Sequence, residues 1–154
     1  SDQLDFIKAS VNLNIPFFTG HALADSRLPE WLNKEQAARV RVLTAYPLLV
    51  ETENAGNKLH QQILNEYAPH LSANRWTLYG QAVAELMVEV LKRAGRSLSR
   101  QKAIIAAENI KQWQGKLLPP VFLDSRNHLV LSSFRVSQIS PGRVNHLSEW
   151  IDGR

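Results

Sequence analysis

The sequence predicts an α/β fold in which helices flank a mostly parallel sheet and the chain ends in an antiparallel β-meander. Apolar residues recur at helical spacing through most of residues 1–116. Short apolar runs, typical of buried strands, interrupt these helices. In the tail, residues 129–139 instead alternate with period two, the pattern of half-buried strands. A chain of 154 residues is long enough to bury such a core.

The first part of the chain is predicted to alternate between helices and strands. Residues 2–12 are expected to form a helix, because their apolar positions fall three and four apart. A short buried strand is predicted at 15–19 and a helix at 28–38. Residues 39–48 alternate as a strand that ends at Tyr46 and the following proline.

Three longer helices are predicted next. Thr52 is expected to cap a helix that reaches residue 67, and Ser99 one that reaches residue 110. The strongest pattern covers residues 74–94, and Gly95 suits the position just after a helix. The apolar positions of this helix predict one buried stripe, made of Trp76, Tyr79, Val83, Leu86, Met87, Val90 and Leu91.

The tail is predicted as a strand, a turn, a long strand, a turn and a short returning strand. Residues 118–122 are apolar and aromatic, and 124–127 form a polar turn in which Asp and Asn side chains bond their own backbone. Residues 129–139 alternate as the long strand. A Pro-Gly turn at 141–142 then leads to the return at 144–150.

Composition limits the classes of function. Hydrophobic residues make up 44% and charged residues 21%, as in ordinary globular domains, and cysteine is absent, which excludes disulfides and thiolate chemistry. No apolar run approaches the roughly 18 residues of a membrane span. The net charge of +4 suggests a nucleic-acid partner. However, the basic residues are dispersed, and the densest group, at 92–102, suits the C-terminus of a helix. We therefore expect no nucleic-acid partner and no transmembrane segment.

The loop after the strand at 15–19 is the first candidate site. In open α/β sheets, ligands bind beyond the carboxyl ends of strands. Gly20, His21, Ala22 and Leu23 are therefore candidate ligand-binding residues. The alternative is a plain connection from strand to helix with Gly20 at a tight bend, and the sequence leaves both possibilities open.

No motif of catalytic or cofactor chemistry is found. The sequence contains neither a GxGxxG or GxxxxGK[ST] phosphate loop nor a GxSxG nucleophile elbow. Its five histidines never stand at HxxxH or HExxH spacing, and His60, His70 and His146 are expected at the surface. Glu51 and Glu53 are better explained by a helix N-terminus than by acid–base chemistry. We predict no catalytic residues, no cofactor and no metal site, hence a binding module rather than an enzyme.

Three stretches carry a resemblance to a known family. They are the opening FIKASVNLNIPFFTGHAL, the helix TLYGQAVAELMVEVLKRAG, and the tail LLPPVFLDSRNHLVLSSFRVSQISPGRV with a late Trp150. In this order and spacing they resemble the last part of the substrate-binding proteins of ABC-type branched-chain amino acid uptake systems, the Leu/Ile/Val-binding type. The resemblance covers nearly the whole chain.

The resemblance implies a fold and a function. Such proteins have two three-layer α/β lobes joined by three crossing strands and close on a ligand by hinge motion. They are periplasmic or lipid-anchored, bind amino acids or related small polar or carboxylate ligands, and present the closed form to an ABC permease. A ligand-sensing domain of a signalling receptor is the alternative. The hypothesis of a free-standing enzyme is supported only by the pair His21 and Asp25 and is not favoured.

The resemblance also implies a division of the chain. Residues 1–45 match the end of a second-lobe segment, 46–116 a first-lobe helical segment, and 117–154 the final second-lobe meander. Family members are much longer, so we expect this chain to be a fragment of a larger two-lobed protein. The missing half of the fold, or a second copy of the chain, is expected to cover apolar faces left open.

Two regions are assigned to the ligand by the resemblance. Residues 20–23 resemble the second-lobe cleft loop, where relatives place an acidic residue for the ligand's ammonium group. This chain has His21 there, and Asp25 comes later. Tyr79 resembles an aromatic residue near the cleft, and its alternative is a core tyrosine at the start of a helix.

Overall fold

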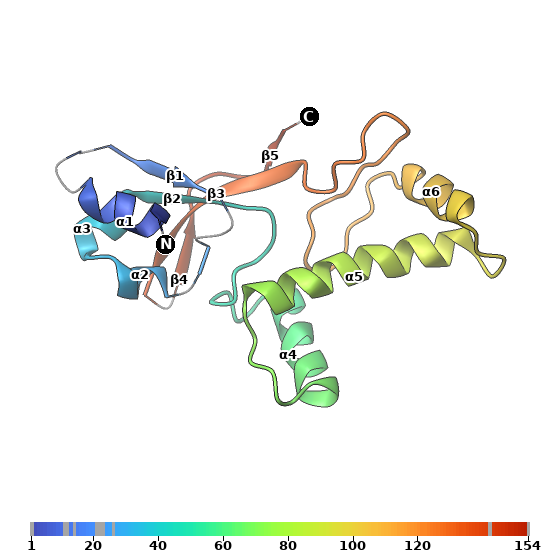
Figure 1. The fold of residues 1–154 in the computed structure, drawn as a ribbon, viewed down its shortest axis with the longest axis horizontal. Helices are drawn as coiled ribbons and strands as arrows, with labels where there is room; N and C mark the ends of the chain where they lie inside the picture. Colours follow the sequence, from blue (N-terminus) through green and yellow to red (C-terminus); the bar gives the residue numbers. More distant parts are fainter. Residues whose placement is uncertain are drawn as a thin grey trace.

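The computed structural model describes residues 2–10, 13, 15–20, 24–25, 27–141 and 143–153. The helices are α1 (Asp2–Ala9), α2 (Leu28–Trp31), α3 (Lys34–Arg39), α4 (Ala55–Tyr67), α5 (Arg75–Ala94) and α6 (Arg100–Glu108). The strands are β1 (Phe17–Thr19), β2 (Val40–Thr44), β3 (Ser133–Ser140), β4 (Arg143–His146) and β5 (Ile151–Asp152). They form two groups that lie side by side, a sheet group with α1–α3 and a helical group with α4–α6 (Figure 1).

The sheet confirms the α/β class and the antiparallel tail but not the strand directions. Its order is β1-β2-β3-β4, with β5 also paired to β3. Only β1 and β2 are parallel among the described strands, while β3 pairs antiparallel with β2, β4 and β5. The prediction of a mostly parallel sheet is therefore wrong for these strands. Thr44 at the end of β2 pairs with Arg135 near the start of β3. The two strands are antiparallel because the chain re-enters the sheet at the same end of the strands at which it left.

The sheet group has its own hydrophobic cluster. Val40 and Val42 of β2 and Ile139 of β3 are buried on one face of the sheet, against Ile7 of α1 and Leu28 of α2. Their burial joins helices and strands that are far apart in sequence and supplies most of the stabilisation of this group.

The helix predicted over 28–38 is divided into two. Leu32 leaves the helical conformation, with φ −123° and ψ 148°. Asn33 then caps α3: its side chain accepts a hydrogen bond from the Gln36 amide at 2.9 Å, and the Gln36 side chain accepts one from the Asn33 amide at 2.9 Å. This reciprocal capping box starts a new helix in the middle of the predicted one.

The helical group follows the predictions closely at its helix ends. Ser99 caps α6 and Gly95 ends α5 with a positive φ of 76°, as expected, and Asn74 caps α5. The cap of α4 is Asn54 instead of Thr52, because the Asn54 side chain accepts hydrogen bonds from two amides of the first turn. His60 was expected at the surface but is buried, with hydrogen bonds to Gln81 and Thr77 at 2.8 and 2.9 Å.

A second hydrophobic cluster lies in the helical group. Leu78, Ala82 and Val90 of α5 are buried in it, together with Ile110 and Tyr46. The predicted stripe of α5 is wrong for five of its members, which are exposed: Trp76, Tyr79, Val83, Met87 and Leu91. Apolar residues occur on two faces of this helix, and helical spacing alone does not show which face is covered.

The first strand of the predicted tail is absent from this structure. Residues 117–123 form one isolated antiparallel bridge, between Trp113 and Val121. Instead, this segment inserts four side chains into the cluster of the helical group: Leu117, Leu118, Val121 and Leu123. Apolar side chains at consecutive positions suit a buried coil as well as a strand, so the sequence pattern did not separate them.

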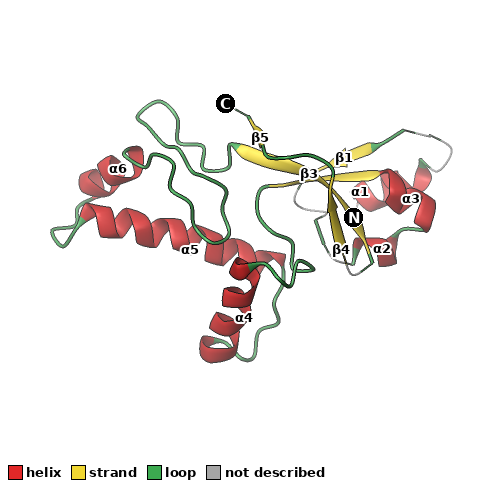
Figure 2. Ribbon diagram, turned by 180° about the vertical axis from the view of Figure 1, so that it is seen from behind, coloured by secondary structure: helices red, strands yellow, loops and turns green. Residues whose placement is uncertain are grey.

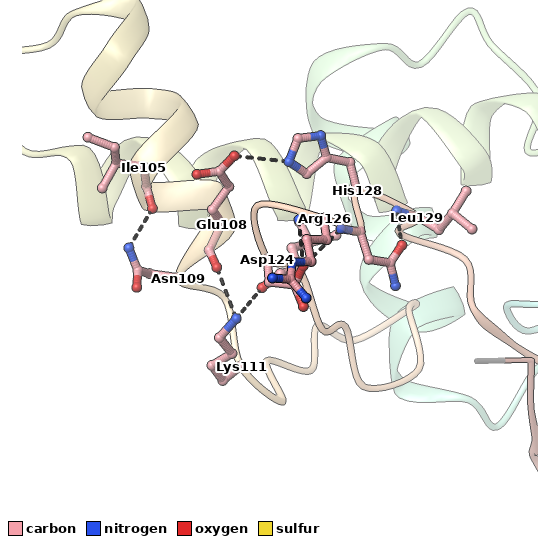
Figure 3. A network of polar contacts seen from close by, with 10 residues as sticks. Ile105, Glu108, Asn109, Lys111, Asp124, Arg126, His128 and Leu129 are labelled. Carbon is pink, nitrogen blue, oxygen red and sulfur yellow. Dashed lines mark hydrogen bonds and ion pairs between the residues drawn. The ribbon is translucent and has the colours of Figure 1, made fainter.

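The turn that follows is confirmed and is attached to α6 (Figure 3). The Asp124 side chain accepts hydrogen bonds from the amides of Arg126 and Asn127 at 2.7 and 2.8 Å. The His128 ring lies 3.1 Å from the Glu108 carboxylate, and the Lys111 ammonium donates to the backbone carbonyls of Glu108 and Leu123. These contacts hold the turn against the helical group.

Two segments connect the groups. One is 45–50, which follows β2, and the other is 130–132, which precedes β3 (Figure 2). Side chains of the first segment belong to both clusters, since Tyr46 packs in the helical group and Leu48 in the sheet group. The orientation of the two groups therefore depends on these two short connections.

Candidate ligand-binding site

A cavity of about 360 Å³ lies where the two groups meet. Its walls come from three places: the segment before α2, the connection after β2, and the beginning of α5. The described lining residues are Ala24, Asp25, Arg27, Tyr46, Pro47, Leu48, Leu49, Ser72, Ala73, Asn74, Arg75 and Leu78. Its charged members, Asp25, Arg27 and Arg75, dominate the electrostatics of the wall.

Asp25 provides the negative charge of the cavity. Its carboxylate accepts hydrogen bonds from the Arg27 amide at 2.9 Å and from the Arg27 guanidinium at 3.1 and 3.2 Å. The Arg75 guanidinium lies 3.6 Å from Oδ2 of the same carboxylate. Burial opposes ionisation, but the hydrogen bonds from Arg27 and the charges of both arginines hold the pKa of Asp25 below its ordinary value of 3.8. Asp25 is therefore ionised at neutral pH.

Arg75 is the first residue of α5, directly after the Asn74 cap. A cation in the first turn of a helix opposes the helix dipole, so its position needs compensation. Part of this comes from Asp25, and part from Trp76, whose ring lies 4.9 Å from the guanidinium carbon of Arg75. The Nε atom of Arg75 is buried and has no hydrogen-bond partner among the described residues.

Two further side chains shape the cavity. The Arg27 guanidinium stacks over the Trp31 ring at 5.0 Å. Tyr46 is almost fully buried, and its ring centroid lies 6.1 Å from that of Tyr79 on α5. Burial, with a smaller contribution from Tyr79, raises the pKa of the Tyr46 hydroxyl above its ordinary range although Arg75 opposes the shift. Tyr46 is therefore a neutral, protonated phenol at physiological pH.

The structure places the sequence-predicted site residues as follows. His21, Ala22 and Leu23 lie outside the described residues. Gly20 is exposed just after β1 and lines a separate groove beside α1 with Phe6. Tyr79 is absent from the cavity wall but contacts Tyr46, which is part of it. All five assignments remain predictions.

Sequence reasoning did not assign Tyr46, Asp25 or Arg75 to the site. The sequence indicates Asp25 as an acidic residue late in the loop and as the partner of His21 in the disfavoured enzyme hypothesis, and Tyr46 as the end of a strand. Arg75 did carry a usable signal, because a basic residue directly after an N-cap is in an unfavourable position and suggests a specific partner.

Other classes of site find no support in the part of the chain that the structure describes. No group of three or more histidine, aspartate or glutamate side chains is arranged to hold a metal ion there. Among the same residues, no helix combines the length and the apolar character that crossing a bilayer requires.

Comparison with known proteins identifies the fold. No protein-family model and no curated protein matches the sequence. A branched chain amino acid ABC transporter from Thermus thermophilus, crystallised with bound valine, aligns with 97% of this chain at a TM-score of 0.75 and 13% identity. A possible leucine/isoleucine/valine-binding protein from Rhodopirellula baltica aligns with 95% at a TM-score of 0.72 and 18% identity.

These similarities confirm, at the level of the fold, the resemblance that the sequence predicts. This chain has the fold of one part of such binding proteins. It spans only 43% and 40% of the length of the two proteins. The remainder of their fold has no counterpart in these 154 residues.

Proposed function

We propose that this chain is part of an extracytoplasmic solute-binding protein that captures an amino acid or a related small polar or carboxylate ligand for ABC uptake. The observation that carries this proposal is the cavity of about 360 Å³ between the sheet group and the helical group. Its volume is in the range of small-molecule sites, roughly 300–1,000 Å³. The likeness in fold to a transporter component with bound valine supports the same class of ligand.

The proposed mechanism is capture by closure of two lobes. In this proposal residues 1–45 belong to the second lobe and 46–116 to the first, as the resemblance implies. Residues 117–129 pack with the first-lobe helices, and the second lobe resumes at 133. The connections at 45–50 and 130–132 would act as the hinge, since they join the two hydrophobic clusters. Closure would remove water from the ligand and strengthen its polar contacts.

The proposed ligand contacts combine the residues predicted from the sequence with those that line the cavity. The loop after β1 would contact the ligand through Gly20, His21, Ala22 and Leu23. Tyr79 would act on the ligand indirectly, through its contact with Tyr46. The cavity itself adds charged groups that such a ligand can use.

The proposal also includes partners and location. An ABC permease would receive the ligand, and the protein would work in the periplasm or at the outer side of a membrane. Its binding would involve no bond-making chemistry. The half of the fold that this chain lacks, or a second copy of it, would complete the cleft.

The test uses the longest natural polypeptide that contains these 154 residues. Thermal-shift screening against amino acids, their amides and small carboxylic acids is expected to give at least one concentration-dependent rise in Tm. Small-angle scattering with that ligand should show a smaller radius of gyration. A Tm unchanged by every compound would contradict the proposed function.

A further inference from the structure

We propose that the cavity selects its ligand by a carboxylate group, that Arg75 binds this group, and that no ammonium group is required. This deepens the proposed function and rests on it. The selection would admit simple carboxylic acids as well as amino acids and reject amides.

The first argument is the unused hydrogen-bonding capacity of Arg75. A guanidinium carries five N–H donors. The contacts of Arg75 with the described residues are an ion pair at 3.6 Å to Asp25, beyond ordinary hydrogen-bond length, and a stack on Trp76. Its side chain is 25% exposed, and its Nε is buried without a partner. A partly buried guanidinium with spare donors, at the wall of a cavity, is suited to a planar anion that it can bind with two hydrogen bonds.

The second argument is that Asp25 is already engaged. Both of its oxygens accept from the Arg27 guanidinium, and one also accepts from the Arg27 amide. An ammonium group of a ligand would have to compete with the Arg27 guanidinium for these oxygens. Asp25 therefore serves Arg27 and Arg75, and its charge is not available to select an amino group.

The third argument is the charge balance of the wall. Among the described residues that line the cavity, the charged side chains are Asp25, Arg27 and Arg75, which leaves one positive charge in excess. Arg27 is mostly exposed and its charge is neutralised by Asp25. The remaining positive charge is that of Arg75, and the apolar side chains that also line the cavity, Leu48 among them, increase its attraction for an anion.

The alternative role for Arg75 is structural, as a bridge from α5 to Asp25 across the boundary between the two groups. Substitution would then weaken folding and affect all ligands alike. A carboxylate-binding role instead affects ligands according to whether they carry the carboxylate. This difference decides between the two roles.

The experiment measures Kd by calorimetry for two matched series on the longest natural polypeptide. One series is leucine, 4-methylpentanoate and leucinamide, and the other is phenylalanine, 3-phenylpropanoate and phenylalaninamide. Within a series that binds, we expect the simple acid to bind at least as tightly as the amino acid. The amide should bind at least about tenfold more weakly, because it leaves the guanidinium unpaired.

Substitutions then assign the effect. Arg75→Gln should weaken binding of both carboxylates at least about tenfold and change that of the amide less than threefold, because only the carboxylates use the fork. Arg75→Lys keeps the positive charge but loses the paired donors of the guanidinium, so its Kd for the carboxylates should lie between those of the parent protein and of Arg75→Gln. This variant remains informative if the Gln variant unfolds. Arg93→Gln is the matched control on the same helix, since Arg93 bonds Glu89 away from the cavity.

The possible failures are distinct. If both series bind but the amides bind as tightly as the acids, or if Arg75→Gln weakens all ligands equally, the inference is wrong and the proposed function stands. If no member of either series binds, and no compound of the wider screen does, the proposed function falls and the inference with it.

Discussion

Asp25 is fixed by donors from Arg27 and by the positive charge of Arg75, so the fold requires its ionised form. Its pKa is held below 3.8, which means that its contribution to stability is present above that pH and is lost as the pH falls through the lowered pKa. Asp25→Asn should lower the free energy of unfolding at pH 7 by about 1–3 kcal/mol, since charge-assisted hydrogen bonds are lost.

Urea unfolding at pH 7 and at pH 3 checks this prediction. The difference between the Asp25→Asn variant and the parent protein should narrow at the lower pH, because pH 3 lies below the ordinary pKa of 3.8 and the unfolded parent chain takes up a proton on Asp25 there. Glu53→Gln serves as the control, since Glu53 pairs with Lys58 on the surface and should have little influence at either pH. Equal stability of parent and Asp25→Asn at pH 7 would show that the pairing is energetically neutral.

At the scale of elements, the packing of α4 depends on a glycine. A Cβ atom at Gly56 would lie 2.4 Å from the Cδ2 atom of Leu117 and 2.6 Å from the Lys116 carbonyl oxygen. The carbonyl belongs to the backbone and cannot move aside easily. Gly56→Ala should therefore destabilise the protein by about 1–3 kcal/mol through overpacking, as measured by thermal or urea unfolding.

Gly80 in the interior of α5 is the matched control for this substitution. Nothing lies within 4 Å of a Cβ atom built there. Gly80→Ala should stabilise the protein by about 0.5–1 kcal/mol, because alanine restricts the unfolded chain and favours a helix. If both variants changed stability in the same direction, the close approach at Gly56 would not be the cause.

The two faces of α5 should also respond differently to truncation. Leu78 is buried in the helical cluster, whereas Met87 on the other face is 54% exposed. Leu78→Ala should cost about 2–5 kcal/mol of stability, because it removes buried methyl groups and leaves a cavity. Met87→Ala should cost less than about 1 kcal/mol. Chemical unfolding of the two variants measures this, and equal losses would mean that the Met87 face is also packed.

Several elements could be predicted because their signals are local. Asn74, Ser99 and Gly95 define helix ends within a few residues of themselves, and the alternation in 133–140 defines β3. The division at Leu32 was missed because the capping box at Asn33 lies inside a continuous helical pattern. Local chemistry thus fixes most elements but not every boundary.

At the scale of the whole molecule, strand direction and the site could not be predicted in this way. The direction of β3 depends on where the chain re-enters the sheet after the whole helical group. The site depends on a contact between Asp25 and Arg75, which are far apart in sequence and belong to different groups. Sequence patterns indicated the loop before α2, but only the folded chain shows which side chain of α5 faces it.

The two hydrophobic clusters predict two regions of separate local stability. Val42 belongs to the sheet cluster and Ile110 to the helical cluster, and both are fully buried. Val42→Ala should accelerate amide hydrogen exchange mainly in β1–β4, and Ile110→Ala mainly in α5 and α6. Mass spectrometry of exchanged peptides measures both. A uniform acceleration by either variant would show that the clusters unfold as one unit.

Each guanidinium of the cavity lies over an indole ring, Arg27 over Trp31 and Arg75 over Trp76. Indole emission is sensitive to a cation that moves or loses its charge nearby. Occupancy of the cavity can therefore be followed through the intrinsic fluorescence of the protein, without an attached dye. Replacing Trp76 by phenylalanine would show how much of the optical response comes from the α5 side.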